Sequence, residues 1–174
     1  MKFPSFRALD RRRVAIVLIA ITTVILFAGC NDDRDFTLGI SPPIEVMGLK
    51  SGELKSGKTF LGKPLVIDFW ASWCQPCLEL MPDVSSLAKE FKGKVNVIGV
   101  SSENPYIIKR FWKTSGNHYK AYFDRNSFTN LKFKIREIPT IAVLDANGKL
   151  VYEVTAPDIN SVRKTLNALL GIKQ

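Results

Sequence analysis

Two cysteines three positions apart, placed directly after a short apolar run, constrain this chain more than any other feature. The run covers residues 64–70, and the cysteines are Cys74 and Cys77 in the sequence WASWCQPC. A short apolar run of this kind predicts a buried strand, and the periodic apolar positions after Cys77 predict a helix. We therefore expect Cys74 where a strand leads into a helix, within reach of Cys77.

The start of a helix favours a thiolate. Unpaired backbone N–H groups and the helix dipole stabilise negative charge there, so the pKa of Cys74 should fall below its free value of about 8.5. Cys74 is the predicted nucleophile. Cys77, one turn further in, is the predicted resolving cysteine. Pro76 fits the first turn, where its missing N–H costs little.

Two other roles for the cysteine pair are a structural disulfide and half of a zinc site. A structural disulfide requires an oxidising compartment. A zinc site needs further ligands, and the sequence has no second cysteine pair and a single histidine, His118. We therefore predict no metal site. The preferred interpretation is dithiol chemistry with no cofactor beyond a redox-active disulfide between Cys74 and Cys77.

Two segments resemble the thioredoxin superfamily. Residues 66–77 resemble its active-site segment, and residues 134–140 resemble its cis-proline loop. The likeness covers about residues 45–170 and, with the N-terminal segment, is greatest for membrane-tethered, periplasm-facing TlpA/ResA-like proteins. It implies an α/β thioredoxin fold, in which helices flank a central mixed β-sheet, and it implies a thiol-disulfide oxidoreductase.

The same resemblance implies further site residues. Asp68 matches a buried aspartate credited with accepting a proton from the resolving cysteine, and its apolar neighbours predict a pKa above about 3.9. The alternative for Asp68 is a carboxylate in solvent at the end of a strand. A cis bond between Ile138 and Pro139 is implied, and the alternative for Pro139 is a proline that begins a strand. The predicted substrate-binding residues are Trp73, Gln75, Pro76, Ile138 and Pro139.

Two positions depart from the family pattern. ResA-like proteins carry a glutamate three residues after the second cysteine, where this chain has Leu80, with Glu79 one step away. Asp68 therefore carries more of the predicted proton transfer. The second departure is Ala156, which stands where thioredoxin has a glycine beside its partner groove.

The N-terminal segment resembles a secretory signal. Residues 1–29 hold five Lys or Arg against one Asp, and residues 14–29 carry no charge. An uncleaved membrane anchor is the alternative, although a comfortable span needs about twenty apolar residues. Residues 26–30, LFAGC, resemble a bacterial lipoprotein processing site, which predicts lipidation of Cys30. Residues 31–32, Asn-Asp, resemble signals that retain lipoproteins at the inner membrane.

These signals divide the chain into a signal peptide or anchor (1–29), a tether (30–43) and a thioredoxin-like domain (44–174). The length of 174 residues, 46% of them hydrophobic, suffices for one buried core. The net charge of +9 falls to +5 once the leader is set aside. The aromatic and basic segment 106–112 is interpreted as a helix face packed on the sheet, so nucleic-acid binding is not expected.

The remaining elements follow from periodicity and turn residues. We expect helix 74–91 to contain Pro82 and to kink there. The other expected elements are an edge strand at 44–47, strands at 95–101, 121–124, 140–145 and 149–154, helices at 105–114 and 160–170, and a helical turn at 127–133.

The predicted function is a membrane-tethered periplasmic enzyme that reduces disulfides in exported proteins, with apocytochromes as candidate clients and a membrane electron-transfer protein as donor. Gln75 and Pro76 place neither charge nor histidine beside Cys74, which argues against a strong oxidant. The alternatives are a thiol oxidant or isomerase, and a non-enzymatic copper-binding module on the same fold, with His118 as the histidine ligand.

Overall fold

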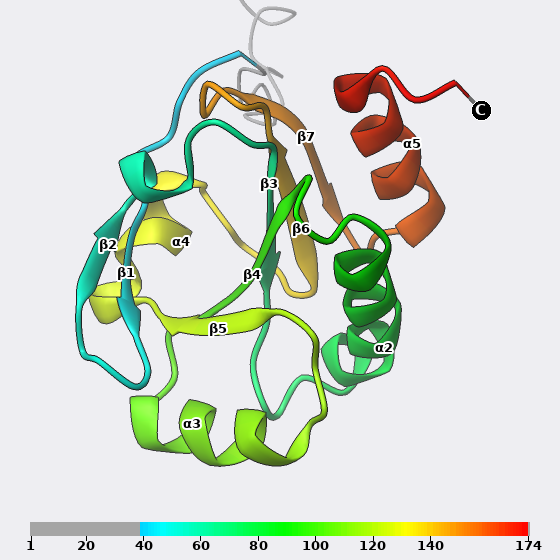
Figure 1. Cartoon of the computed structure of the whole chain (residues 1–174). Helices are drawn as coiled ribbons and strands as arrows, with labels where there is room; N and C mark the ends of the chain where they lie inside the picture. Colours follow the sequence, from blue (N-terminus) through cyan, green and yellow to red (C-terminus); the bar gives the residue numbers. More distant parts are fainter. Residues whose placement is uncertain (1–38, 174) are drawn as a thin grey trace, which may run out of the picture. The chain divides into compact units, whose positions relative to one another are not determined.

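The computed structural model describes residues 39–173 (Figure 1). The predicted signal peptide or anchor, Cys30 and most of the predicted tether lie outside the described residues. Within residues 39–173, no helix is long and apolar enough to cross a membrane. The elements are β1 (Glu45–Gly48), β2 (Leu54–Ser56), η1 (Gly57–Phe60), β3 (Leu65–Phe69), α2 (Gln75–Glu90), β4 (Asn96–Ser101), α3 (Pro105–Thr114), β5 (Lys120–Phe123), η2 (Arg125–Ser127), α4 (Phe128–Lys132), β6 (Thr140–Leu144), β7 (Leu150–Thr155) and α5 (Ile159–Leu170).

A seven-stranded mixed sheet has the strand order β2-β1-β5-β4-β3-β6-β7. Strands β3, β4 and β5 are parallel to one another. On one side, β6 pairs antiparallel with β3 and with β7. On the other side, β1 pairs antiparallel with β5 and with β2. All five residues of β3 are buried, because the strand lies inside the sheet and both of its faces are covered. The single charged residue of this strand is Asp68.

Helices α2 and α5 lie side by side against one face of the sheet (Figure 1). The apolar stripe of α2 contributes Val84 and Leu87, that of α5 contributes Val162 and Leu166, and all four join one core cluster with Val66 of β3. Helix α3 joins a neighbouring cluster. Helix α2, which begins beside the two cysteines, therefore packs on the same face of the sheet as α5.

The opposite face of the sheet is covered by α4, η1 and the residues around them. The ring of Phe69 contacts Phe133, which follows α4, with ring centroids 5.4 Å apart, and Phe60 of η1 contacts Tyr122 edge-on at 5.9 Å. Successive residues of a strand point to opposite faces. Because Phe69 points away from α2, its neighbour Asp68 lies on the face that α2 covers.

The structure confirms the expected α/β fold and corrects the sequence prediction at one strand. The expected edge strand at residues 44–47 is β1, but β1 is an interior strand that pairs with β2 and β5. The edge position next to β1 belongs to β2, a strand that was not predicted. Pro42 and Pro43 precede β1, so their missing N–H groups do not interrupt the hydrogen bonds of the sheet. The other predicted strands and α-helices begin and end within one residue of the prediction, whereas η1 was not predicted.

The last residues of the predicted tether contact the folded domain. The N–H of Gly39 donates to the carbonyl of Leu150 at 2.7 Å, and the N–H of Leu150 donates to the carbonyl of Ile40 at 2.8 Å. Pro42 and Ile44 are buried. Residues 39–43 therefore belong to the folded unit that contains the sheet.

Candidate active site

The connection from β3 to α2 carries the two cysteines. Cys74 is the N-cap residue of α2, with an extended backbone conformation. Its N–H donates to the carbonyl of Ala71 at 3.1 Å, and its Sγ accepts a hydrogen bond from the N–H of Cys77 at 3.3 Å. The sulfur of Cys74 therefore occupies the position at which a side chain satisfies the open N–H groups of a helix.

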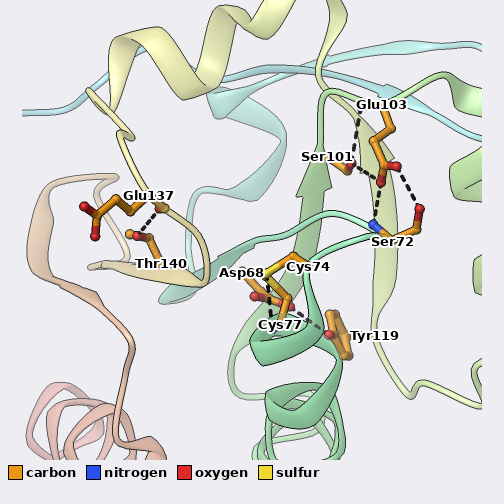
Figure 2. The surroundings of a disulfide bond; sticks show 9 residues. All are labelled: Asp68, Ser72, Cys74, Cys77, Ser101, Glu103, Tyr119, Glu137 and Thr140. Atoms are coloured by element: carbon orange, nitrogen blue, oxygen red, sulfur yellow. Dashed lines mark hydrogen bonds between the residues drawn. A yellow bond between two sulfur atoms is a disulfide. The ribbon is translucent and has the colours of Figure 1, made fainter.

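Cys74 and Cys77 form a disulfide (Figure 2). Their Cα atoms lie 5.3 Å apart, and the Sγ atoms are 1.98 Å apart. Cys74 is 5% exposed and Cys77 is 1% exposed. The spacing in the sequence thus brings the two sulfurs together at the start of one helix, with Cys74 nearer to solvent.

Asp68 lies beneath the first turns of α2, whose buried stripe begins with Cys77 and Met81. Asp68 is 2% exposed, and its carboxylate accepts a hydrogen bond of 2.9 Å from the hydroxyl of Tyr119 (Figure 2). Burial raises the pKa of Asp68 from 3.8 to about 7, and the hydrogen bond from Tyr119 opposes part of that rise. The predicted direction of the pKa is confirmed, and the solvent-exposed alternative is wrong.

A carboxyl group with a pKa near 7 can accept and return a proton at neutral pH. Asp68 is at the end of the strand that leads to Cys74, and it faces the helix that contains Cys77. The arrangement can therefore supply a buried proton acceptor to thiol chemistry at the start of α2.

Three residues predicted to contact substrate lie beside the disulfide on the surface. Trp73 is 74% exposed, and Gln75 and Pro76 are exposed in the first turn of α2. The side-chain Nε2 of Gln75 donates to Oε1 of Glu79 at 3.1 Å. Glu79 is exposed, whereas Leu80 packs against the core cluster under α2. Glu79 therefore points to solvent and does not share the core-facing side of α2 with Leu80, which holds the position of the ResA-like glutamate.

The bond between Ile138 and Pro139 is cis, as the family resemblance implied. Pro139 is buried, and Ile138 packs against the cluster that contains both cysteines. The hydroxyl of Thr140 donates to the carbonyl of Glu137 at 2.7 Å, and the N–H of Ala156 donates to the carbonyl of Pro139 at 2.9 Å. These hydrogen bonds hold the loop before β6 in place against the disulfide.

Trp70 is buried and contacts aromatic residues of α3. Its ring centroid lies 5.2 Å from that of Phe111 and 5.0 Å from that of Trp112. The rings lie over Gly99 of β4, where a Cβ atom would come within 3.0 Å of the Trp70 Nε1 atom. Within the described part of the chain, that Nε1–H group makes no hydrogen bond.

Glu103 and Tyr119 also belong to the site, although neither was predicted from the sequence. Glu103 follows β4, and its carboxylate accepts hydrogen bonds from the backbone N–H and the hydroxyl of Ser72, two residues before Cys74 (Figure 2). Parallel strands place their carboxyl ends at one edge of a sheet, which was a signal that these two loops meet. No comparable signal existed for Tyr119, because 51 positions separate it from Asp68.

His118, the candidate copper ligand, is exposed, and its backbone N–H donates to the hydroxyl of Ser85 at 2.9 Å. Among residues 39–173, no group of three or more His, Cys, Asp or Glu side chains is arranged to hold a metal ion.

Comparison with known proteins places the whole arrangement in a family. The family model described as Redoxin matches residues 34–170. The thiol-disulfide oxidoreductase ResA of Bacillus thuringiensis subsp. konkukian is 25% identical over 151 residues, which cover 85% of this chain and 87% of the relative. Thioredoxin of Haemophilus influenzae is 29% identical over 121 residues, which cover 70% of this chain and 89% of the relative.

Two solved structures share the fold. A Chlorobium tepidum protein assigned as the thiol:disulfide interchange protein DsbE has a TM-score of 0.70 and 23% identity, covering 77% of this chain and 98% of that one. The exposed lipoprotein thioredoxin Etrx1 of Streptococcus pneumoniae has a TM-score of 0.64 and 27% identity, covering 72% and 98%. This chain therefore belongs to the Redoxin family, as a ResA/TlpA-like member of the thioredoxin superfamily with thiol-disulfide oxidoreductase activity.

Proposed function

We propose that this oxidoreductase reduces disulfides in exported proteins while it is tethered to the periplasmic side of a bacterial inner membrane. The observation that carries the reaction is the disulfide between Cys74 and Cys77 at the start of α2, with Asp68 buried beneath that helix. The signal-like sequence of residues 1–29 and the resemblance of residues 26–30 to a lipoprotein processing site support the location. The lipoprotein from Streptococcus pneumoniae supports a lipid anchor at Cys30.

In the first step, the Cys74 thiolate attacks one sulfur of a disulfide in the partner protein. A bond forms between Cys74 and that sulfur, the bond between the two partner sulfurs breaks, and the electron pair leaves on the second sulfur, which takes a proton from water. The N–H of Cys77, which already contacts Cys74 Sγ, stabilises the attacking thiolate.

In the second step, Cys77 gives its proton to Asp68 and its thiolate attacks the Cys74 sulfur. The bond between Cys74 and Cys77 forms, and the bond between Cys74 and the partner breaks. The partner leaves as a thiolate and is protonated by water. The partner has then gained two electrons, and this protein is left oxidised. A carboxyl pKa near 7 suits Asp68 to this exchange, since the group can hold or release a proton at neutral pH.

The partner protein would contact the surface around Cys74. The exposed ring of Trp73 and the exposed side chains of Gln75 and Pro76 offer side-chain contacts on one side. The backbone of Ile138, next to the cis bond to Pro139, offers strand-like hydrogen bonding on the other. This surface would accept an extended cysteine-bearing segment.

The reducing direction rests on the residues between the cysteines. Gln75 and Pro76 bring neither positive charge nor a histidine next to Cys74. A strong oxidant is one in which such groups stabilise the thiolate of the reduced form, and they are not found between these two cysteines. A membrane electron-transfer protein would return two electrons to the disulfide after each cycle. Apocytochromes, which need reduced cysteines for haem attachment, are the proposed clients.

Reduction of insulin by dithiothreitol, followed as turbidity, tests the reaction with the full-length protein in detergent. The wild type should accelerate insulin reduction, and Cys74→Ser should not. In a separate experiment in cells, Cys77→Ser should accumulate mixed disulfides with its client proteins and so capture them. No acceleration by the wild type would contradict the proposal. A reduction potential near −270 mV would support a reductase, whereas one near −120 mV would indicate the oxidant or isomerase alternative.

The location has its own test. Cells grown with a labelled fatty acid should incorporate label into the wild type and not into Cys30→Ser, and the labelled protein should fractionate with the inner membrane. An unlabelled wild type would contradict lipidation of Cys30 and would leave the uncleaved anchor as the means of attachment.

A further inference from the structure

Tyr119 supplies the hydrogen bond that the buried Asp68 carboxylate receives. The Tyr119 hydroxyl donates to Oδ2 of Asp68 at 2.9 Å, and both residues are buried (Figure 2). Oδ1 of Asp68 accepts no hydrogen bond from the described part of the chain. One oxygen of the carboxylate is therefore held, and the other is available for a proton.

Contacts that do not involve the hydroxyl fix Tyr119 in place. The ring stands edge-on to Trp112 at a centroid distance of 5.0 Å, and the Tyr119 carbonyl accepts a hydrogen bond from the Trp112 indole N–H at 3.2 Å. The preceding residue, His118, is tied through its backbone N–H to Ser85 of α2. The hydroxyl is thus aimed at Asp68 by the packing of its own ring and backbone.

The surroundings of Asp68 contain few charged or titratable groups. Its cross-strand neighbours are Gly99 on β4 and Ile141 on β6, and the titratable group on the buried stripe of α2 above it is Cys77. Tyr119 is the titratable group whose side chain contacts the carboxylate. Within residues 39–173, the Tyr119 hydroxyl is therefore the polar side chain that compensates the burial of this carboxylate.

Tyr119 keeps its proton throughout the physiological range. Burial and the adjacent Asp68 raise the pKa of Tyr119 above its ordinary value. The hydroxyl therefore acts as a donor to Asp68, and a donor interacts more strongly with the charged carboxylate than with the neutral acid.

We propose that Tyr119 is the positioning residue for the resolution step, in which its hydroxyl holds Oδ2 of Asp68 and so presents Oδ1 to the sulfur of Cys77. This proposal rests on the proposed role of Asp68. The Cys77 proton moves to Oδ1, the Cys77 sulfur forms a bond with Cys74, and the partner sulfur leaves with the electron pair of the broken bond. The Tyr119 proton stays on the phenol.

The substitution Tyr119→Phe tests the proposal, because it removes the hydroxyl and keeps the ring that packs on Trp112. Reduced full-length protein is mixed with 5,5′-dithiobis(2-nitrobenzoate), and thionitrobenzoate release is followed by stopped flow from pH 5 to 9. Attack by Cys74 releases the first equivalent, and resolution by Cys77 releases the second.

Tyr119→Phe should raise the pH midpoint of the second phase by about one unit, since the charged carboxylate loses its donor. The second phase should slow about fivefold at pH 7, because the carboxylate is then mostly protonated. The first phase should keep its rate. Only a variant with a hydroxyl or another hydrogen-bond donor at position 119 should restore the wild-type pH midpoint of the second phase.

Tyr122→Phe is the matched control, since Tyr122 lies three residues further on, is 7% exposed against 6% for Tyr119, and does not contact Asp68. It should leave the midpoint unchanged. In an Asp68→Asn background, Tyr119→Phe should have no further effect on the second phase.

Three results would overturn the proposal. An unmoved midpoint in Tyr119→Phe, even with a slower second phase, would assign Tyr119 a structural role alone. An equal slowing in the Asp68→Asn background would show that Tyr119 does not act through Asp68. If Asp68→Asn resolved the mixed disulfide at the wild-type rate, Asp68 would have no part in the mechanism and the proposal for Tyr119 would fail. The proposed reductase function would still stand if the protein were active in the insulin assay.

Discussion

The carboxylate of Glu103 holds Ser72 by two hydrogen bonds, one of 2.6 Å from the backbone N–H and one of 2.7 Å from the hydroxyl. The hydroxyl of Ser101 also donates to this carboxylate, at 3.3 Å (Figure 2). Since Ser72 comes two residues before Cys74, a loop that follows β4 fixes the turn that carries the proposed nucleophile.

Glu103→Ala should lower the free energy of unfolding by about 1.5 to 3 kcal/mol, because Ser72 loses the acceptor for its N–H and its hydroxyl. Urea denaturation of the oxidised protein measures this. The matched control is Glu53→Ala, which removes an exposed ion pair of 3.0 Å with Lys55 and should cost less than about 1 kcal/mol. Equal losses in the two variants would contradict a stabilising role for the Glu103 contacts.

The buried Asp68 makes stability depend on pH. Its pKa is raised from 3.8 to about 7 in the folded protein, so between these values the folded state holds a proton that the unfolded chain has lost. The contribution of Asp68 to stability is therefore full below about pH 4, falls as pH rises towards 7, and is lost above that.

Asp68→Asn should remove this dependence, because the amide does not titrate. At pH 8 the variant should be more stable than the wild type by a few kcal/mol, since each pKa unit corresponds to about 1.4 kcal/mol. Urea denaturation at pH values from 4 to 9 measures the difference. Parallel stability curves for the two proteins would show that the pKa of Asp68 is not raised.

Gly99 leaves room for the aromatic rings beside Asp68. A Cβ atom there would lie 3.0 Å from Trp70 Nε1 and 3.2 Å from Trp112 Cη2. Gly99→Ala should therefore lower the free energy of unfolding by about 1 to 3 kcal/mol through overpacking. Gly57→Ala is the control, because its Cβ would meet Ile44 at an ordinary 3.6 Å. Thermal unfolding compares the two, and an unaffected Gly99→Ala would mean that the rings shift freely.

Ala156 has a φ of +49°, in the left-handed region that favours glycine. Ala156→Gly relieves this conformation but adds freedom to the unfolded chain. The net change should be a gain of about 0.5 to 1 kcal/mol in the free energy of unfolding, measured by urea denaturation. Ala146→Gly, at a position without positive φ, should instead lose a similar amount. A loss in both variants would contradict the argument.

Much of the fold could be predicted from the sequence, because the signals involved are local. The apolar run at 64–70 predicted β3, the periodic positions after Cys77 predicted α2, and periodicity with turn residues predicted β6 and β7. The interior position of β1 could not be predicted, because the prolines before it indicate an edge and the partner strand β5 comes more than seventy residues later.

The sequence by itself determined where the cysteines lie, since a strand, a turn and a helix N-cap are set by neighbouring residues. It favoured burial of Asp68, because the residues on both sides of it are apolar, but the tertiary structure excluded the solvent-exposed alternative. The tertiary structure alone decided what these groups touch. Tyr119 reaches Asp68, and Glu103 reaches Ser72, through the pairing of strands far apart in the chain. Such contacts depend on strand order and register, which no short-range pattern encodes.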